Sequence, residues 1–308
     1  MDKISVIVAV YNSEKTIIPC IESLLAQSYE KYEIVLVDDA SKDSSLEICR
    51  SYSNKFESII TVSNSKNRGV SETRNIGIDI SSGKYICFVD SDDSVEPDYL
   101  EKLYIAIKEY NTQLSVCGFT YYNYIDNTKE EYIWNRNKEK ELVSLSQGFD
   151  LYGAMYLNAL WNKMFIAKSI KEKNIRFDTA LSMGEDTRFT LEYIKNNKIS
   201  SVVVLSVPLY NYNRFGNTSL MSNFYKQSIN DFLYNMELLY EIVKQYNSDA
   251  SEKYDKVVND FKNSLKYDIL RSDLGIIEML REIRVLFPQY SLLRFCKEYI
   301  SVLKEKIH

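Results

Sequence analysis

Apolar and polar segments alternate regularly through the first 110 residues of the chain. Short runs rich in Val and Ile are typical of buried strands, and apolar residues three or four apart are typical of amphipathic helices. The runs at 4–10, 33–37, 58–62 and 84–89 are predicted to be strands. Helices are predicted after each strand, from Ser13, around Cys49, over Thr73 to Ile80, and from Pro97 to about Tyr110. This alternation predicts an α/β fold with a parallel sheet and helices on its faces.

The pattern changes after residue 114. Strands are predicted at 114–119, 159–166, 202–205 and 209–212, and an aromatic segment at 120–143 is predicted to be a β-hairpin or an irregular excursion. From about Phe224 onward the apolar spacing is helical, with breaks at Asn247-Ser248, Gly275 and Pro288. We therefore predict a C-terminal helical region over residues 222–308.

The strand predicted at 84–89 ends in three carboxylates within four residues, Asp90, Asp92 and Asp93. Such a cluster repels itself unless it shares a cation. Mg²⁺ or Mn²⁺, bound by carboxylate oxygens and by a diphosphate, fits best. The alternative is a solvated acidic turn before a helix, since Pro97 suits a first helical position.

Polar residues also follow the other predicted strands: Tyr11, the pair Asp38-Asp39, and Asn67. Parallel strands present their carboxyl ends at one edge of a sheet, where α/β folds bind ligands. We therefore expect these residues and the Asp90 cluster to line one site.

The composition, the missing motifs and the net charge disfavour several classes of function. The single histidine is the last residue, His308, so the folded region offers none for a His-based triad or zinc site. No GxGxxG or GxxxxGK[ST] is present, which disfavours dinucleotide dehydrogenases and P-loop enzymes. The net charge of −5 disfavours a nucleic-acid partner. The remaining chemistry must use carboxylates, Arg, Lys, Tyr and a metal.

The five cysteines are scattered singly and favour reduced thiols. The sequence has no signal-peptide pattern and no apolar run of ~18 residues. The expected location is cytoplasmic, with association to the inner face of the cell membrane as a further hypothesis. Residues 276–303 carry an apolar stripe. It is expected to pack on the preceding α/β domain or on a second subunit, or else to contact a membrane.

Five motifs in order resemble the family 2 glycosyltransferases over roughly residues 3–220. The first strand and its turn resemble that family's start, although proline is more usual at position 9. The remaining four motifs are Val37-Asp38-Asp39-Ala40-Ser41, Asn67-x-Gly69 with Thr73-Arg74-Asn75, the DxD at Asp90-Ser91-Asp92, and Glu185-Asp186.

This resemblance implies a GT-A fold over residues 1–221, with a nucleotide-sugar half at about 1–119 and an acceptor half at about 120–221. It implies that Ala9, Tyr11 and Asp39 hold the base and ribose, and that Asn67 and Ser91 belong to the donor site. Arg74 would contact the base or diphosphate. Asp90 would face the ribose and the metal, and Asp92 would bind the metal. Asp186 would be the general base, with Glu185 pointing elsewhere; Arg214, Asn217 and Ser219 would help the diphosphate leave.

The implied activity is inverting transfer of a hexose or N-acetylhexosamine from a nucleotide sugar, most simply a UDP-sugar, with Mn²⁺ or Mg²⁺. The implied acceptor is a glycan, glycoprotein or lipid-linked glycan of a bacterial surface polysaccharide. A homo-oligomer through the C-terminal helices is a further hypothesis.

Three other interpretations remain open at this point. A catalytically silent member would bind a nucleotide sugar or assemble a complex. A haloacid-dehalogenase-like phosphatase would use Asp90 as its nucleophile, but that residue normally follows the first strand, and here three strands precede it. A response-regulator receiver would use Asp38-Asp39 and leave most of the chain unexplained.

Overall fold

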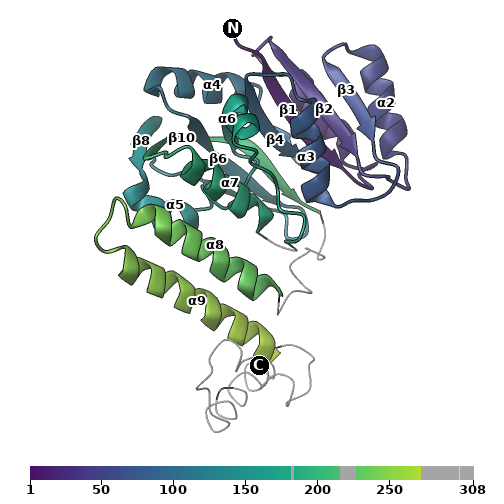
Figure 1. Ribbon diagram of the computed structural model, residues 1–308. Coiled ribbons are helices and arrows are strands. Elements are labelled where there is room, and N and C mark those ends of the chain that lie inside the picture. Colours follow the sequence, from purple (N-terminus) through teal and green to yellow (C-terminus); the bar gives the residue numbers. More distant parts are fainter. Residues whose placement is uncertain (182–183, 216–226, 272–297, 299–308) are drawn as a thin grey trace.

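The computed structural model describes residues 1–181, 184–215, 227–271 and 298 (Figure 1). Within these residues one ten-stranded sheet runs in the order β3-β2-β1-β4-β9-β6-β10-β5, with β7 beside β6 and β8 beside β10. The first four strands pair in parallel and confirm the predicted core. Their bounds are β1 (Ile4–Val10), β2 (Tyr32–Asp38), β3 (Ile59–Ser63) and β4 (Tyr85–Asp90). The helices between and after them are α1 (Ile17–Leu25), α2 (Ser45–Lys55), α3 (Val70–Ile80) and α4 (Tyr99–Tyr110).

The second half of the sheet is mixed rather than parallel. β10 runs parallel to β6, whereas β9 is antiparallel to both β4 and β6. The predicted hairpin at 120–143 is present, since β6 turns back into β7. The strands are β5 (Ser94–Val95), β6 (Leu114–Asn123), β7 (Thr128–Tyr132), β8 (Lys140–Ser144), β9 (Lys163–Ile166) and β10 (Ser201–Arg214). The helices are the 3-10 turn η1 (Leu145–Gln147), α5 (Gly148–Gly153), α6 (Ala167–Glu172) and α7 (Glu185–Asn196).

Strand alternation divides the core into two layers. Ile7 and Phe88 point to one face of the sheet and pack with residues of α3, α6 and α7. Val8 and Val89 point to the other face and pack with residues of α1 and α4. Because successive strand residues face opposite sides, this double burial explains why the first strands are almost continuously apolar.

Two strand predictions need correction. The strand predicted at 159–166 begins only at Lys163, because residues 159–162 form a buried turn; an apolar run alone does not separate the two. The strands predicted at 202–205 and 209–212 are one strand, β10. Its register shifts on both sides of Pro208, which has no N–H to give to the ladder.

The C-terminal region is helical where the structure describes it, with α8 (Gln227–Val243) and α9 (Ala250–Arg271). The break between them includes the predicted Asn247-Ser248. In Figure 1 the two helices lie side by side below α5 and α7. Asn247 donates to the carbonyl of Ser146 at 2.9 Å, which ties this pair of helices to the sheet domain.

The apolar stripe at 276–303 and the breaks at Gly275 and Pro288 lie outside the described residues, so the hypotheses about them stay predictions. Among the helices that are described, none combines the length and the hydropathy needed to cross a membrane.

Candidate active site

The buried guanidinium of Arg74 joins two of the predicted motifs. Its Nη2 donates to Asp90 Oδ1 at 2.9 Å, and its Nη1 donates to Asp186 Oδ1 at 2.7 Å. Arg74 is on α3, Asp90 ends β4, and Asp186 is in the first turn of α7. Arg74 is only 5% exposed, so burial strengthens these charged contacts. The carboxyl end of β4 and the start of α7 therefore form one site.

The expectation that Glu185 points elsewhere is wrong. Its Oε1 accepts from the same Nη1 of Arg74 at 3.2 Å. Both side chains belong to the first turn of α7, and both turn toward the buried guanidinium of Arg74. Adjacent helical residues diverge by about 100°, but a long Glu side chain bends back far enough to share a donor.

Three carboxylates, those of Asp90, Glu185 and Asp186, contact one guanidinium. Burial raises the pKa of Asp186; Arg74 opposes this increase, whereas Glu185 and Asp90 add to it. The dipole at the start of α7 by itself favours the ionised form of Asp186. A helix dipole contributes typically 0.3–1 kcal/mol, which here is outweighed by burial among like charges.

A second buried cation lies near this cluster. Lys163 on β9 is fully buried, and its ammonium donates to the Ala159 carbonyl and, at 2.7 Å, to Asn162 Oδ1. Burial lowers the pKa of Lys163 to about 7, and the nearby Asp186 carboxylate opposes this decrease. Sequence reasoning missed this lysine because it lies inside an apolar run.

The third aspartate of the DxD segment is fixed by β10. Asp93 is 2% exposed. Its Oδ2 accepts from the Tyr210 hydroxyl at 2.6 Å, and its Oδ1 accepts from the Asn213 backbone N–H at 2.7 Å. The Asn213 side chain also donates to the Asp92 carbonyl at 3.1 Å. Asp93 therefore positions the loop, and sequence reasoning missed both of its partners on β10.

Asp92 and Asp90 carry the oxygens that fit a divalent cation. Asp92 is exposed, and no side chain of a described residue donates to its carboxylate. Arg74 occupies Oδ1 of Asp90 and leaves Oδ2 without a donor in the described part of the chain. No group of three His, Cys, Asp or Glu side chains forms a metal site among these residues. Two carboxylates are enough for Mg²⁺ or Mn²⁺ when substrate phosphates and water complete the coordination.

Asp39 lies at the edge of the sheet after β2 and shapes the loop after β3. Its carboxylate accepts the backbone N–H groups of Arg68 at 2.9 Å and Gly69 at 2.8 Å, and the side chain of Asn64 at 2.8 Å. Asp39 is 3% exposed, whereas Asn67, in the loop after β3, is exposed. In this structure the carboxylate holds the loop that carries Asn67.

The first strand leads to the same edge. Ala9 pairs with both Val37 and Asp90, so it lies between β2 and β4. Tyr11 follows β1 and is 44% exposed. The hydroxyl of Ser91 lies 2.7 Å from that of Ser13, which ties the DxD loop to the start of the α1 segment. The residues of β1, β2 and β4 and of the turns after them that are predicted to bind the nucleotide sugar thus lie at one edge of the sheet.

The predicted loop after β10 is described only in part. Arg214 ends β10 and donates from Nη1 to the Tyr121 hydroxyl at 3.2 Å. Asn217 and Ser219 lie outside the described residues.

Helix α8 contacts the residue that precedes Glu185. Gly184 has φ +74°, a left-handed conformation that favours glycine. The buried Asn235 of α8 donates to the Gly184 carbonyl at 2.9 Å and accepts from Arg188 Nε at 3.1 Å. A Cβ on Gly184 would lie 2.7 Å from the Asn235 amide nitrogen. The C-terminal helices therefore fix the start of α7.

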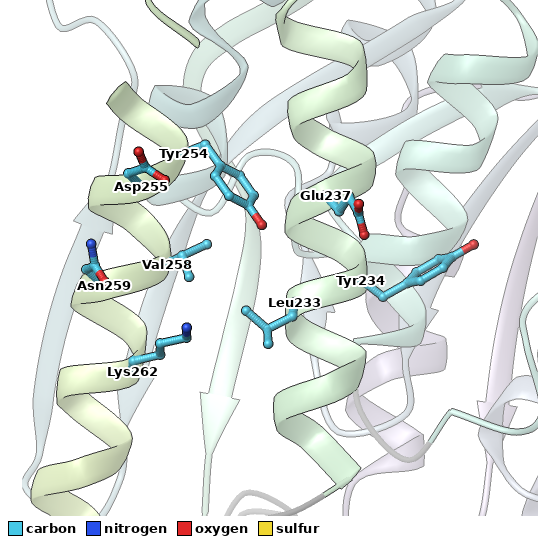
Figure 2. A pocket seen from close by; sticks show the side chains of 8 residues that line it. All are labelled: Leu233, Tyr234, Glu237, Tyr254, Asp255, Val258, Asn259 and Lys262. Atoms are coloured by element: carbon cyan, nitrogen blue, oxygen red, sulfur yellow. The ribbon is translucent and has the colours of Figure 1, made fainter. Parts of the chain in front are cut away.

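A groove of about 530 Å³ opens between α8 and α9 (Figure 2). It is lined by Leu233, Tyr234, Glu237, Tyr254, Asp255, Val258, Asn259 and Lys262. None of these residues is predicted to bind the nucleotide sugar or to act in catalysis, so this groove is separate from the Arg74 site.

Comparison with known proteins gives consistent matches. Glycosyltransferase GlyA of Streptococcus pneumoniae serotype 4 is 34% identical over 218 residues, which cover 68% of this chain and 30% of that protein. The poly(ribitol-phosphate) beta-glucosyltransferase of Bacillus spizizenii is 36% identical over 202 residues, which cover 64% of this chain and 30% of that protein. This chain thus spans about a third of the length of these relatives.

The crystal structure of Staphylococcus aureus TarS 1-349 in complex with UDP-GlcNAc has a similar fold. Its TM-score is 0.65 at 23% identity, over 92% of this chain and 71% of that one. Residues 5–168 match the family described as Glycosyl transferase family 2. With more than half of its length in this match, the chain belongs to glycosyl transferase family 2.

Proposed function

We propose that the chain is an inverting glycosyltransferase. It transfers a hexose or N-acetylhexosamine from a UDP-sugar to a hydroxyl of a glycan or glycoconjugate. The observation that carries this proposal is the Arg74 cluster. In it a single side chain, Arg74, contacts both the DxD carboxylate Asp90 and the candidate base Asp186. A donor with a diphosphate leaving group needs charge stabilisation on one side and a base on the other, and this cluster provides groups for both.

Donor binding is assigned to the edge of the parallel strands. Ala9, Tyr11, Asp39, Asn67 and Ser91 are proposed to hold the base and ribose, directly or by shaping the loops there. Asp92 and Asp90 would hold Mn²⁺ or Mg²⁺, which supplies Lewis acidity toward the diphosphate oxygens. A guanidinium has five N–H bonds. Besides those that contact its carboxylate partners, Arg74 therefore keeps N–H groups that can donate to the diphosphate or to the nucleobase.

We assign to Asp186 the role of general base. Its carboxylate takes the proton of the acceptor hydroxyl as the acceptor oxygen bonds to the anomeric carbon. The bond from that carbon to the diphosphate oxygen breaks, and the nucleoside diphosphate leaves with the electron pair. Because attack is opposite the leaving group, an α-linked donor gives a β-linked product.

The acceptor is proposed to be a glycan, glycoprotein or lipid-linked glycan of a bacterial surface polymer. The relatives support this class, since one of them is a poly(ribitol-phosphate) beta-glucosyltransferase. Family membership disfavours the phosphatase interpretation. A silent member would need neither a candidate base such as Asp186 nor candidate metal ligands such as Asp90 and Asp92, so we favour an active enzyme.

A thermal-shift screen tests the donor assignment. UDP-, GDP-, TDP- and CMP-sugars are added with Mn²⁺ or with EDTA. A ligand that binds only the native state raises Tm by mass action, by several degrees near ~100 times Kd. We expect this increase with a UDP-sugar and Mn²⁺ together. No increase with any nucleotide sugar would contradict the assignment.

Transfer is expected to become faster as pH rises. The base must be deprotonated, and the pKa of Asp186 is raised by burial. Below that raised pKa most molecules carry a protonated Asp186 and are inactive; above it they are active. The measurement is kcat from pH ~5 to ~9 at saturating donor and Mn²⁺. A level profile over this range, as a base with the ordinary aspartate pKa of about 3.9 would give, would be inconsistent with this base.

Asn235→Ala is expected to lower kcat by about 10- to 100-fold and to leave donor affinity within about twofold. The change removes the hydrogen bonds to Gly184 and Arg188, and small displacements of a catalytic group are costly. Rates and calorimetric donor binding are measured on the same protein.

The matched control is Asn247→Ala, which removes another side-chain bond from the helical pair to the sheet domain, one that goes to Ser146 rather than to the start of α7. It should lower Tm without changing kcat. Equal kcat losses in both variants would mean that α8 supports only stability.

A further inference from the structure

Lys163 of β9 is a buried cation to which the proposed mechanism gives no role. Lysine is almost never fully buried unless it is paired, because an ammonium that leaves water loses its hydration. The hydrogen-bond partners of Lys163 are the Ala159 carbonyl and the side-chain oxygen of Asn162. Both partners are neutral, so they fix the position of the ammonium without balancing its charge.

The ammonium lies in the turn of residues 159–162, which is held from two sides. The buried side chain of Asn162 donates to the Cys117 carbonyl of β6 at 3.2 Å, and the Cys117 N–H donates to the Asn162 carbonyl at 2.9 Å. On the other side, the Tyr99 hydroxyl of α4 donates to the Trp161 carbonyl at 2.7 Å. The turn therefore holds the charge of Lys163 at a defined place.

The residue before this turn contacts the start of α7. The Thr187 hydroxyl donates to the Asn158 carbonyl at 3.3 Å, and Thr187 directly follows Asp186 in the sequence. The Asp186 carboxylate is close enough to oppose the decrease in the pKa of Lys163 that burial causes. The ammonium thus lies on the Asp186 side of the Arg74 cluster.

The Arg74 cluster contains more negative than positive groups. Asp90 of β4 and both Glu185 and Asp186 of α7 contact one guanidinium. Buried like charges raise one another's pKa unless a further cation is present. Lys163 is such a cation, on the side of the cluster opposite to the DxD loop in the chain of contacts from Asp90 through Arg74 to Asp186.

The other ionisable groups around the turn are neutral near pH 7. Burial raises the pKa of the Cys117 thiol to about 12. Burial also raises the pKa of the Tyr99 hydroxyl well above its usual range. The charge of Lys163 therefore acts mainly on the carboxylates of the cluster, and above all on Asp186.

We propose that Lys163 is a positioning residue for the transfer reaction, whose ammonium keeps the Asp186 carboxylate in the ionised form that can accept a proton. This inference rests on the proposed function, in which Asp186 is the base. A nearby cation favours the charged form of a carboxyl group. With Lys163 in place, Asp186 can act as a base at a lower pH than burial among like charges would otherwise allow.

The variants Lys163→Met and Lys163→Gln test this inference. Both remove the charge; methionine fills the buried space, and glutamine keeps an N–H donor for the turn. UDP release from UDP-glucose and UDP-GlcNAc is measured from pH ~5 to ~9, with Mg²⁺ and a mixture of bacterial oligosaccharides. Calorimetric binding of UDP, measured on the same proteins, reports whether each variant is folded.

The loss of rate is expected to depend on pH. Lys163 is charged below its lowered pKa of about 7 and neutral above it, so its effect on Asp186 is present at low pH and is lost as pH rises. At low pH both variants should be about tenfold slower than the wild type, because an opposite charge shifts a carboxyl pKa by about one unit or more. The rates should converge as pH approaches ~9, and UDP affinity should stay within about twofold.

Tyr99→Phe is the matched control, because it removes a hydrogen bond to the same turn and leaves every charge in place. It should lower Tm and keep the wild-type pH profile. If the wild type releases no UDP at any pH, the proposed function fails. If the wild type is active, only the role of Lys163 is overturned by variants that match it at every pH, that are slowed by one constant factor, or that no longer bind UDP.

Discussion

Replacing Asp186 by asparagine is expected to lower kcat by ~10²–10⁴ while donor affinity hardly changes. Asparagine has the size of aspartate, and its amide oxygen accepts the hydrogen bond that Arg74 Nη1 now gives at 2.7 Å. The geometry of the cluster is therefore kept, whereas the amide cannot take a proton. Donor binding by calorimetry and initial transfer rates are measured on the same variant.

Glu185→Gln is the matched control, since Glu185 contacts the same nitrogen of Arg74 at 3.2 Å. It removes a neighbouring charge without removing the assigned base, so its loss of kcat should be smaller. Equal losses of binding and rate in Asp186→Asn would make Asp186 a binding residue. Unchanged transfer would move the base elsewhere, although not to Asp93, whose two oxygens are already engaged by β10.

Replacing Asp92 by asparagine is expected to abolish transfer and the metal-dependent part of donor binding. The fold should be retained, because Asp92 is exposed and its loss relieves repulsion from the neighbouring carboxylates. A neutral amide oxygen is a much weaker ligand for Mn²⁺ or Mg²⁺ than a carboxylate. Calorimetry with UDP, with and without Mn²⁺, gives the metal-dependent part, and the transfer rate is measured beside it.

Asp98→Asn is the control for this change. Asp98 is a nearby acid that pairs with Lys102 at 2.7 Å and takes no part in the site. Its replacement should change neither metal binding nor rate. Near wild-type activity in Asp92→Asn would make the metal assignment wrong.

The parallel half of the fold was predictable because its strands are buried on both faces. Continuous apolar runs, alternating with helical spacing, leave few other arrangements for residues 4–110. The same pattern predicted which polar residues reach the carboxyl edge, since position at a strand end follows from the strand itself. Asp90, Asp39 and Tyr11 are at that edge.

The partners of these residues were not predictable, because they come from distant parts of the chain. Asp93 accepts from Tyr210, which is 117 positions away, and Gly184 is fixed by Asn235, 51 positions away. In addition, the position of a carboxylate at a strand end does not determine which N–H groups donate to it. Asp39 was expected to face a nucleotide base, and it accepts backbone donors of the loop after β3.

The proposed reaction moves the sugar of a nucleotide sugar to a hydroxyl with inversion. A combined ¹H and ³¹P NMR time course tests it directly, with the wild-type protein, the UDP-α-sugar chosen by thermal shift, an oligosaccharide acceptor and Mg²⁺, which does not broaden the signals as Mn²⁺ does. We expect UDP to appear together with a β-anomeric proton signal on the glycan. An α-linked product, inorganic phosphate in place of UDP, or an unchanged donor would contradict it.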